Sequence, residues 1–116
     1  MEKLMFTFEM LQTLAATFPD GFTCDKNTFQ PITKGYCVAV ADTQNSFDNI
    51  GAAKVAAYVC SHNDVNAVGG WFNSDNKKYY YDAVIVVNSL KVAKKLGRLN
   101  KQIAIFDLNK LVEIRL

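Results

Sequence analysis

Hydrophobic residues near the start of the chain recur at steps of three and four, a spacing that places them on one face of a helix. The pattern predicts an amphipathic helix over 3–18, ended by the turn residues of 19–21. Residues 22–34 show no sustained period, so we expect an irregular loop pinned onto the core, with room for a short strand. The periodic positions of the helix are Leu4, Phe8, Leu11, Ala15 and Phe18.

The next part of the chain predicts a buried strand and a helix. Residues 36–41 (YCVAVA) are apolar without alternation, which is typical of a strand covered on both faces. Ser46 is expected to be the N-cap of a helix from Phe47 to about Ser61, whose alanine- and valine-rich stripe faces a sheet. Gly51 lies inside this helix, where glycine costs about 1 kcal/mol relative to alanine.

A β-hairpin is predicted beyond residue 66. The β-type runs 67–72 and 77–87 flank the turn-forming residues Asn73-Ser74-Asp75-Asn76. The first run contains the pair Gly69-Gly70, which suggests a bulge. The second run, with its three tyrosines and four β-branched residues, is the most strand-like segment of the chain.

The last quarter of the chain predicts a helix and two strands. A short helix is expected over 90–99, with Val92, Leu96 and Leu99 facing inward. Residues 102–108 then read as a core strand. The alternation of 111–116 predicts an edge strand. An unprotected edge can pair between chains, so a homo-oligomer is possible.

From residue 36 onward the predicted order is strand, helix, strand, strand, helix, strand. This is the split β-α-β order (βαββαβ) of ferredoxin-like domains, an antiparallel sheet with both helices on one side. We therefore predict an α+β fold in a single domain over 1–116. Within it, 1–34 form an N-terminal helix and loop cover, and 35–116 form the βαββαβ core with a C-terminal edge strand.

Charge is distributed unevenly along a chain of ordinary globular composition. Half of the residues are apolar, 21% are charged and the net charge is +2. Residues 1–76 carry four lysines against eight carboxylates, a net −4, whereas 77–101 carry seven cations against Asp82, a net +6. Such a split indicates either an interaction surface or segments that neutralise each other in the fold.

No catalytic or cofactor-binding pattern is visible. Cys60, His62 and Asp64 have the wrong spacing for one helix face, and we expect Cys37 and Cys60 to be small buried hydrophobes. A single histidine and scattered cysteines predict no metal site, and the glycine pair lacks the rest of a nucleotide loop. The sequence thus favours a non-enzymatic protein without cofactors. No leader or membrane span is recognisable, so a cytoplasmic location and no membrane partner are expected.

A basic face is the clearest candidate binding feature. Its cations step by three, one and three along the predicted helix at 90–99, on the face opposite the apolar residues. Such a stripe suits phosphate backbones or an acidic protein, or it is a solvated helix face. The basic face comprises Lys91, Lys94, Lys95, Arg98 and Lys101.

Further candidate binding residues lie on the hairpin and before the first core helix. Tyr79 and Tyr81 share one strand face, where they either stack nucleic-acid bases or, if a helix covers that face, pack in the core. Asp82 stands where an RNA recognition motif has an apolar or aromatic residue. Trp71 is a binding anchor if exposed. Gln44 and Asn45 precede a helix N-terminus that suits an anion.

Several segments together resemble a family of small proteins encoded by bacteriophages and mobile elements, especially of gut bacteria. The resemblance covers about 21–115 and implies a mobile-element origin and an accessory or host-interaction role, in the host cytoplasm, without transferring any catalytic residue. The segments that carry it are Gly21-Phe22-Thr23, Gly35-Tyr36, Val38-Ala39, Thr43-Gln44-Asn45-Ser46, Gly69-Gly70-Trp71, Tyr79–Asp82 and NKQIAIFDL over 100–108.

Two functional hypotheses follow. The first is a binding protein that acts through protein–protein contacts, with anti-defence inhibition as one form of the role. The second is a nucleic-acid-binding module that uses the basic face at 91–101. A small-molecule or anion site near Gln44, Asn45 and Trp71 is a third option.

Overall fold

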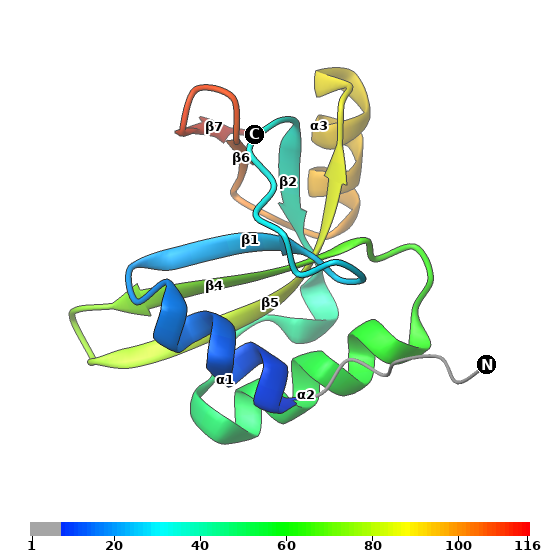
Figure 1. The fold of residues 1–116 in the computed structure, drawn as a ribbon. Helices are drawn as coiled ribbons and strands as arrows, with labels where there is room; N and C mark the ends of the chain where they lie inside the picture. Colours follow the sequence, from blue (N-terminus) through cyan, green and yellow to red (C-terminus); the bar gives the residue numbers. More distant parts are fainter. Residues whose placement is uncertain (1–7) are drawn as a thin grey trace.

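The computed structural model describes residues 8–116 and confirms an α+β fold with an N-terminal helix. In this part of the chain, three α-helices accompany one antiparallel sheet of seven strands (Figure 1). The positions expected at Leu4 and its neighbours lie outside the described residues. In chain order, the elements are α1 (Phe8–Thr17), β1 (Gly21–Asp25), β2 (Tyr36–Ala39), the 3-10 turn η1 (Ala41–Thr43), β3 (Ser46–Phe47), α2 (Asp48–Ser61), β4 (Ala67–Asn73), β5 (Lys78–Val87), α3 (Leu90–Leu99), β6 (Ala104–Asp107) and β7 (Val112–Arg115).

The sheet is organised around the long strand β5. Its order is β1-β4-β5-β2-β6-β7, and the short strand β3 also pairs with β5. The first part of β5 pairs with β4 and the last part pairs with β2, so β5 connects two halves of the sheet. The halves turn away from each other: β1 and β4 cross the middle of Figure 1, whereas β2, β6 and β7 rise above them.

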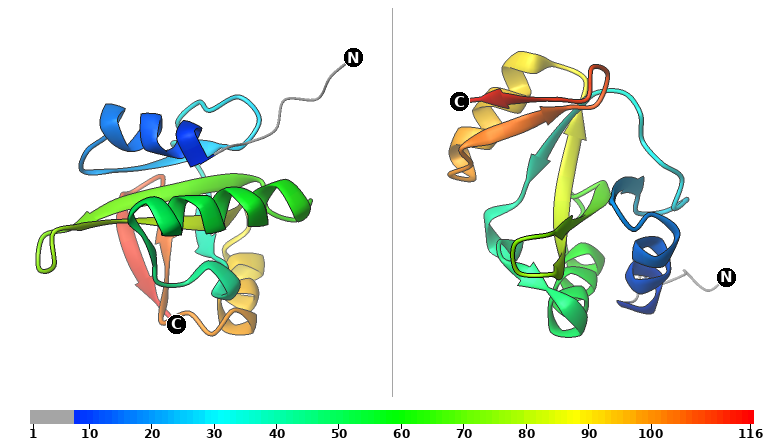
Figure 2. Two further views of the ribbon diagram at one scale, coloured as in Figure 1. Left: turned by 90° about the horizontal axis from the view of Figure 1, so that it is seen from below. Right: turned by 90° about the vertical axis from the view of Figure 1, so that its left-hand side faces the viewer.

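The three helices pack against one face of the sheet. Side chains alternate along β5, and Tyr81 and Ala83 point into a core shared with α1 and α2. Val87, further along the same face of β5, packs in a second core with Val38 and Ala93 under α3. Figure 2 shows α1 and α2 gathered at one end of the sheet and α3 with β6 and β7 at the other. The other face of the sheet is therefore left without a helix.

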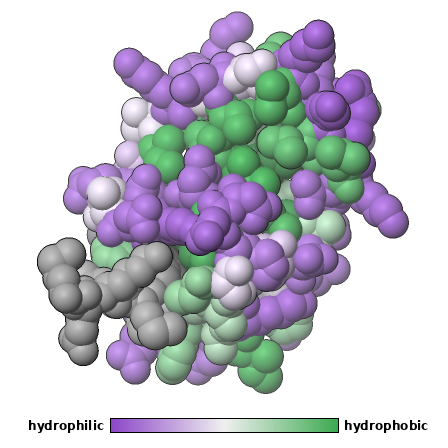
Figure 3. Space-filling view, turned by 90° about the vertical axis from the view of Figure 1, so that its right-hand side faces the viewer, coloured by the Kyte–Doolittle hydropathy of each residue, from purple (hydrophilic) through white to green (hydrophobic). Residues whose placement is uncertain are grey.

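The inward side of α3 differs from the prediction. Leu96 packs against the second core as predicted, but Val92 and Leu99 are 45% and 69% exposed, whereas Ala93 and Gly97 are buried. The reason is close packing: a Cβ at Gly97 would lie 2.6 Å from Leu116 Cδ1, so the helix approaches the sheet through its smallest residues. Figure 3 shows an apolar area among hydrophilic side chains on the upper part of the molecule, the part that carries α3.

The start of α2 also corrects the prediction. Phe47, not Ser46, is the N-cap, and it offers no side-chain hydrogen bond to the helix. Ser46 is instead buried in β3, where its hydroxyl donates to the carbonyl oxygen of Thr43 at 2.7 Å. Thr43 Oγ1 in turn accepts a hydrogen bond from the backbone N–H of Ala83 at 3.1 Å. The segment before α2 is therefore held against β5 by these contacts and by the pairing of β3, and the helix begins only at Asp48.

The other boundaries follow the predictions closely. The segment expected to be irregular contains β1, which pairs with β4 from Gly21 to Asp25. The predicted strand at 36–41 ends at Ala39 and continues as the turn η1. The hairpin of β4 and β5 is confirmed, although its register runs unbroken through Gly69 and Gly70, so the expected bulge is wrong. β7 is confirmed as an edge strand that pairs with β6. Among the described residues, no helix is both long and apolar enough to cross a membrane.

A candidate ligand-binding cavity on the open sheet face

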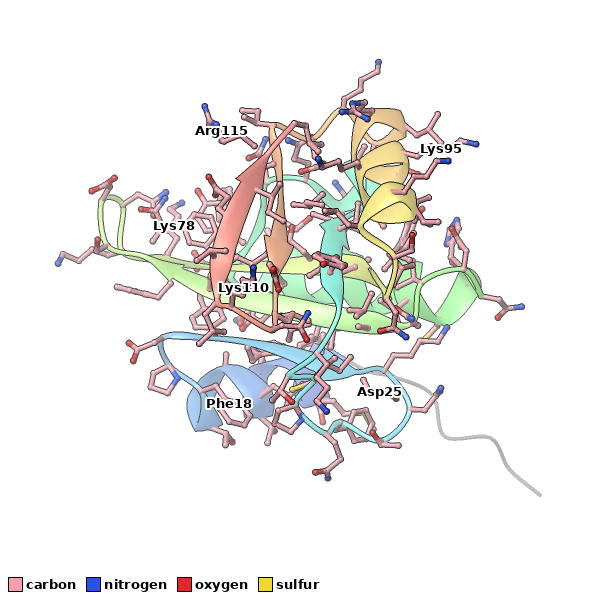
Figure 4. The ribbon with its side chains drawn as sticks, turned by 90° about the horizontal axis from the view of Figure 1, so that it is seen from above. Phe18, Asp25, Lys78, Lys95, Lys110 and Arg115 are labelled. Carbon is pink, nitrogen blue, oxygen red and sulfur yellow. The ribbon has the colours of Figure 1, made fainter. Side chains whose placement is uncertain are left out.

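The sheet face without helices curls around a cavity of about 690 Å³. Figure 4 looks down on this side and shows the β6–β7 hairpin reaching toward β1, with β4 and β5 crossing between them. Residues from all six strands of the main sheet path line it, and most of these side chains are apolar. The residues used below are Asp20, Thr23, Cys37, Gly69, Trp71, Asp82, Phe106 and Glu113.

Sheet register places a carboxylate inside this cavity. Gly69 of β4 pairs with Thr23 of β1 on one side and with Asp82 of β5 on the other. Paired residues of antiparallel strands point to the same face, so all three belong to the open face. Gly69 has no side chain, and the nearest atoms to a Cβ built there are 3.6–4.0 Å away. Between the Thr23 and Asp82 side chains the cavity wall is therefore backbone, and a Cβ added at Gly69 would make ordinary van der Waals contacts without a clash.

The Asp82 carboxylate is half-buried and has no protein partner in the described residues, and its oxygens remain accessible from the cavity. No side chain or backbone group of 8–116 donates a hydrogen bond to it, and no cation lies within ion-pair distance. Burial disfavours the charged form and raises the pKa of Asp82 to about 6. At neutral pH the group is thus largely ionised in a place where the protein offers nothing to compensate its charge.

The nearby thiol of Cys37 is held in its protonated form. Burial, and then the negative charge of Asp82, raise the pKa of Cys37 to about 12, although a hydrogen bond with the Thr23 side chain acts in the opposite direction. Because the thiolate is the nucleophilic form, Cys37 is not an activated nucleophile at neutral pH. The lining therefore offers apolar surface and the Asp82 carboxylate, without an activated thiol.

An aromatic pair stands at the edge of the cavity. Trp71 is 45% exposed and stacks on Tyr80, with ring centroids 4.8 Å apart and an interplanar angle of 18°. The contact fixes the indole ring while leaving part of its surface open. Of the residues singled out from the sequence, Trp71 and Asp82 are the two that the structure brings together in this cavity.

The two tyrosines of β5 lie on the opposite face and pack in the core. Tyr81 is 5% exposed and belongs to the α1–α2 core. Tyr79 packs against this core and donates a hydrogen bond from its hydroxyl to the carbonyl oxygen of Phe18 at 2.7 Å. Burial raises the pKa of Tyr79 to about 12. The interpretation of both residues as core is confirmed, and neither is available for base stacking.

The loop before α2 lies apart from the cavity. Gln44 and Asn45 are exposed, and neither lines it. Asp48 occupies the first turn of α2 and brings a negative charge to the helix end that would otherwise suit an anion. The three residues proposed as one site, Gln44, Asn45 and Trp71, therefore do not form one.

The basic face is present and accessible. Lys91, Lys95 and Arg98 are exposed on α3 and Lys101 follows it, whereas Lys94 is half-buried. Within residues 8–116, the ion pair found joins Arg115 to Glu113. No carboxylate of these residues lies within ion-pair distance of the cations of the basic face. α3 packs on the covered face of the sheet, so the basic face and the cavity belong to opposite sides.

The remaining candidate chemistry is dispersed. Cys60 is exposed on α2, which corrects the expectation of a buried thiol: the buried stripe of α2 ends at Val59, one residue earlier. The ring of His62 stacks on Tyr58, and its Nδ1 lies 2.9 Å from the Tyr58 carbonyl oxygen. Across the described residues, no group of three or more histidine, cysteine and acidic side chains is arranged to hold a metal ion.

Sequence reasoning missed Thr23, Cys37, Gly69 and Glu113 as cavity residues. A signal was present in β5, where Asp82 is a single carboxylate inside an otherwise apolar and aromatic strand. Comparisons with protein-family models, curated proteins and solved structures found no match, so function is argued from the site alone.

Proposed function

We propose that this chain is a non-enzymatic binding protein whose ligand occupies the cavity on the open sheet face. The observation that carries the proposal is the unpaired, half-buried carboxylate of Asp82 in a largely apolar cavity that no helix covers. A partly buried charge without a protein partner lowers the stability of a fold, and such groups concentrate at functional sites. The cavity volume of about 690 Å³ lies within the usual range for small-ligand sites.

We further infer that residues 36–107 form a ferredoxin-like split β-α-β unit. Supporting this, β2, β4, β5 and β6 are arranged in the order β4-β5-β2-β6, and α2 and α3 follow β2 and β5. In RNA recognition motifs the open face of such a sheet binds single-stranded RNA through exposed aromatics. Here that face carries Asp82, whose charge repels phosphates, so a different ligand is proposed for it.

Dye binding tests the proposal. Nile red, an uncharged apolar fluorophore, should bind the wild-type protein in equimolar amount, with brighter dye emission and energy transfer from Trp71, the only tryptophan. Gly69→Leu adds an apolar side chain to the cavity wall beside Asp82 and should reduce dye affinity by at least about tenfold.

The matched control adds the same bulk elsewhere. Ala53→Leu lies on the exposed side of α2 and should leave dye affinity unchanged. Thermal unfolding of both variants separates a blocked cavity from a lost fold. Equal dye binding by wild type and Gly69→Leu would refute the cavity as the binding site.

A second candidate function rests on the basic face. Lys91, Lys95 and Arg98 are exposed, and no carboxylate of the described residues pairs with them. Fluorescence anisotropy with single- and double-stranded probes at low salt tests this function. Affinity should fall steeply with added salt and with charge-reversing substitutions at these three positions. Binding that is absent at low salt would exclude it.

The expected role as an accessory factor of a mobile element, acting through a protein partner, stays a prediction beside these proposals. Affinity capture from lysates of several bacterial hosts tests it. Recovery of one partner, lost when the cavity is blocked by Gly69→Leu, would join this role to the proposed site.

A further inference from the structure

The charge of the cavity is opposite to that of the whole chain. The chain carries a net +2, yet the ionisable groups that line the cavity are the carboxylates of Asp20, Asp82 and Glu113 and the thiol of Cys37. No lysine, arginine or histidine of the described residues contributes to the lining. An anionic ligand would meet repulsion there, whereas a cation would meet attraction.

The three carboxylates differ in their solvent exposure and in whether a cation lies near them. Glu113 is exposed and lies 3.8 Å from the guanidinium of Arg115, and Asp20 is exposed to solvent. Asp82 is half-buried in the central strand, and its oxygens, which accept no hydrogen bond from residues 8–116, are open to the cavity. A ligand with a charged hydrogen-bond donor would therefore give Asp82 the partner that the protein does not provide.

We propose that the cavity selects an organic ammonium ion with an apolar body, its NH₃⁺ group against the Asp82 carboxylate and its body along Trp71 and Phe106. The inference rests on the proposed binding function of the cavity. Both aromatic side chains line the same space as Asp82, and their exposed surface suits an apolar chain or ring. The face of the indole is also attractive to a cation that lies over it.

A charge series on one carbon skeleton tests the inference. Phenylbutylamine, phenylbutanol and phenylbutyrate present a cation, a neutral hydroxyl and an anion on the same apolar body. By titration calorimetry at about pH 7.5, the amine should bind wild type about tenfold more tightly than the alcohol, and the butyrate most weakly. The amine should also displace Nile red.

Two amide variants locate the charge that selects the amine. Asp82→Asn keeps the shape of the side chain and should bring the amine and the alcohol to within about twofold of each other. Glu113→Gln removes a carboxylate from the rim, where solvent and Arg115 already compensate it, and should keep most of the amine preference.

The pH dependence provides a second readout. The amine is charged throughout the accessible range, so its affinity should fall between about pH 7.5 and pH 5 as Asp82 becomes protonated. Asp20 and Glu113 also face the ligand, and Cys37 stays protonated throughout. In Asp82→Asn the fall near pH 6 should disappear.

The outcomes separate this inference from the function on which it rests. If wild type binds Nile red but does not prefer the amine, or if Asp82→Asn retains the preference, the ligand class is wrong and the binding cavity stands. If wild type binds neither the dye nor any member of the series, both the cavity function and the ligand class are refuted.

Discussion

Two adjacent glycines of β4 should respond in opposite ways to the same substitution. Gly69 points to the open face, where a Cβ would have its nearest neighbours at 3.6–4.0 Å. Gly70 points to the helix-covered face, where a Cβ would lie 2.8 Å from Tyr79 Cε1 and 2.8 Å from Phe22 Cζ. We therefore expect Gly69→Ala to be tolerated and Gly70→Ala to destabilise the fold.

The magnitude follows from two effects. Alanine in place of glycine inside a strand gains about 0.5–1 kcal/mol of backbone free energy, and this gain applies to both positions. Overpacking at Gly70 then costs about 1–3 kcal/mol. The Phe22 ring has little freedom to move away, because it stacks on Tyr79, whose hydroxyl is anchored to the Phe18 carbonyl oxygen. The difference between the two variants therefore isolates the clash.

Urea denaturation and thermal unfolding measure this difference. The free energy of unfolding of Gly69→Ala should equal or exceed that of wild type, and that of Gly70→Ala should lie about 1–3 kcal/mol below its neighbour's. In a chain of this size the gap corresponds to roughly 4–12 °C in Tm. Equal stabilities for the two variants would refute the assignment of the two glycines to opposite faces, and with it the register that puts Asp82 in the cavity.

Three further predictions concern stability. Asp82→Asn should raise the free energy of unfolding by up to about 3 kcal/mol at pH 7.5 and leave it nearly unchanged near pH 4. The sign follows because the folded-state pKa of about 6 exceeds the unfolded value, so the native state loses stability as pH rises from about 4 through 6; a gain that is equal at both pH values would contradict it. Gly51→Ala should destabilise by about 2 kcal/mol in urea denaturation, although propensity favours alanine, because the new Cβ would overlap the backbone of Ser46. The control Ala53→Gly, exposed on the same helix, should cost about 1 kcal/mol. Ser89→Ala removes the oxygen that accepts from the N–H of Val92 at 3.3 Å and should lower the free energy of unfolding by about 1 kcal/mol; an unchanged value would show that this cap contributes nothing.

Periodicity predicted the elements because each depends on neighbours along the chain. The alanine- and valine-rich stripe of α2, at Ala52, Val55, Ala56 and Val59, is buried as expected. The same reasoning was right for Leu96 of α3 but wrong for Val92 and Leu99, because both faces fit the helical period and the larger apolar residues were expected inside. Burial there is decided by how closely the helix approaches Ile105 and Leu116, which is a property of the assembled sheet.

The cavity was beyond sequence reasoning for a related reason. Thr23, Cys37 and Asp82 come from three strands that are far apart in the sequence, and only register and sheet curvature bring them together. Alternation along β5 does assign Tyr81 and Asp82 to opposite faces, but it does not say which face the helices cover. Once α1 and α2 are placed over Tyr81, the role of Asp82 follows from the period of two.

The sheet divides the two candidate functions physically, and this division makes them separable by mutation. The acidic cavity lies on the open face around Asp82, and the basic face lies on α3, which packs on the covered side. The positive excess of 77–101 is therefore not neutralised at the cavity, because no lysine or arginine of the described residues lines it and α3 packs on the covered face. Substitutions at Asp82 should change ligand affinity without changing nucleic-acid affinity, and substitutions at Lys91, Lys95 and Arg98 should do the reverse. A variant of either class that alters both activities would mean that the two faces are coupled through the sheet, most directly through β5, which carries Asp82 and leads into α3.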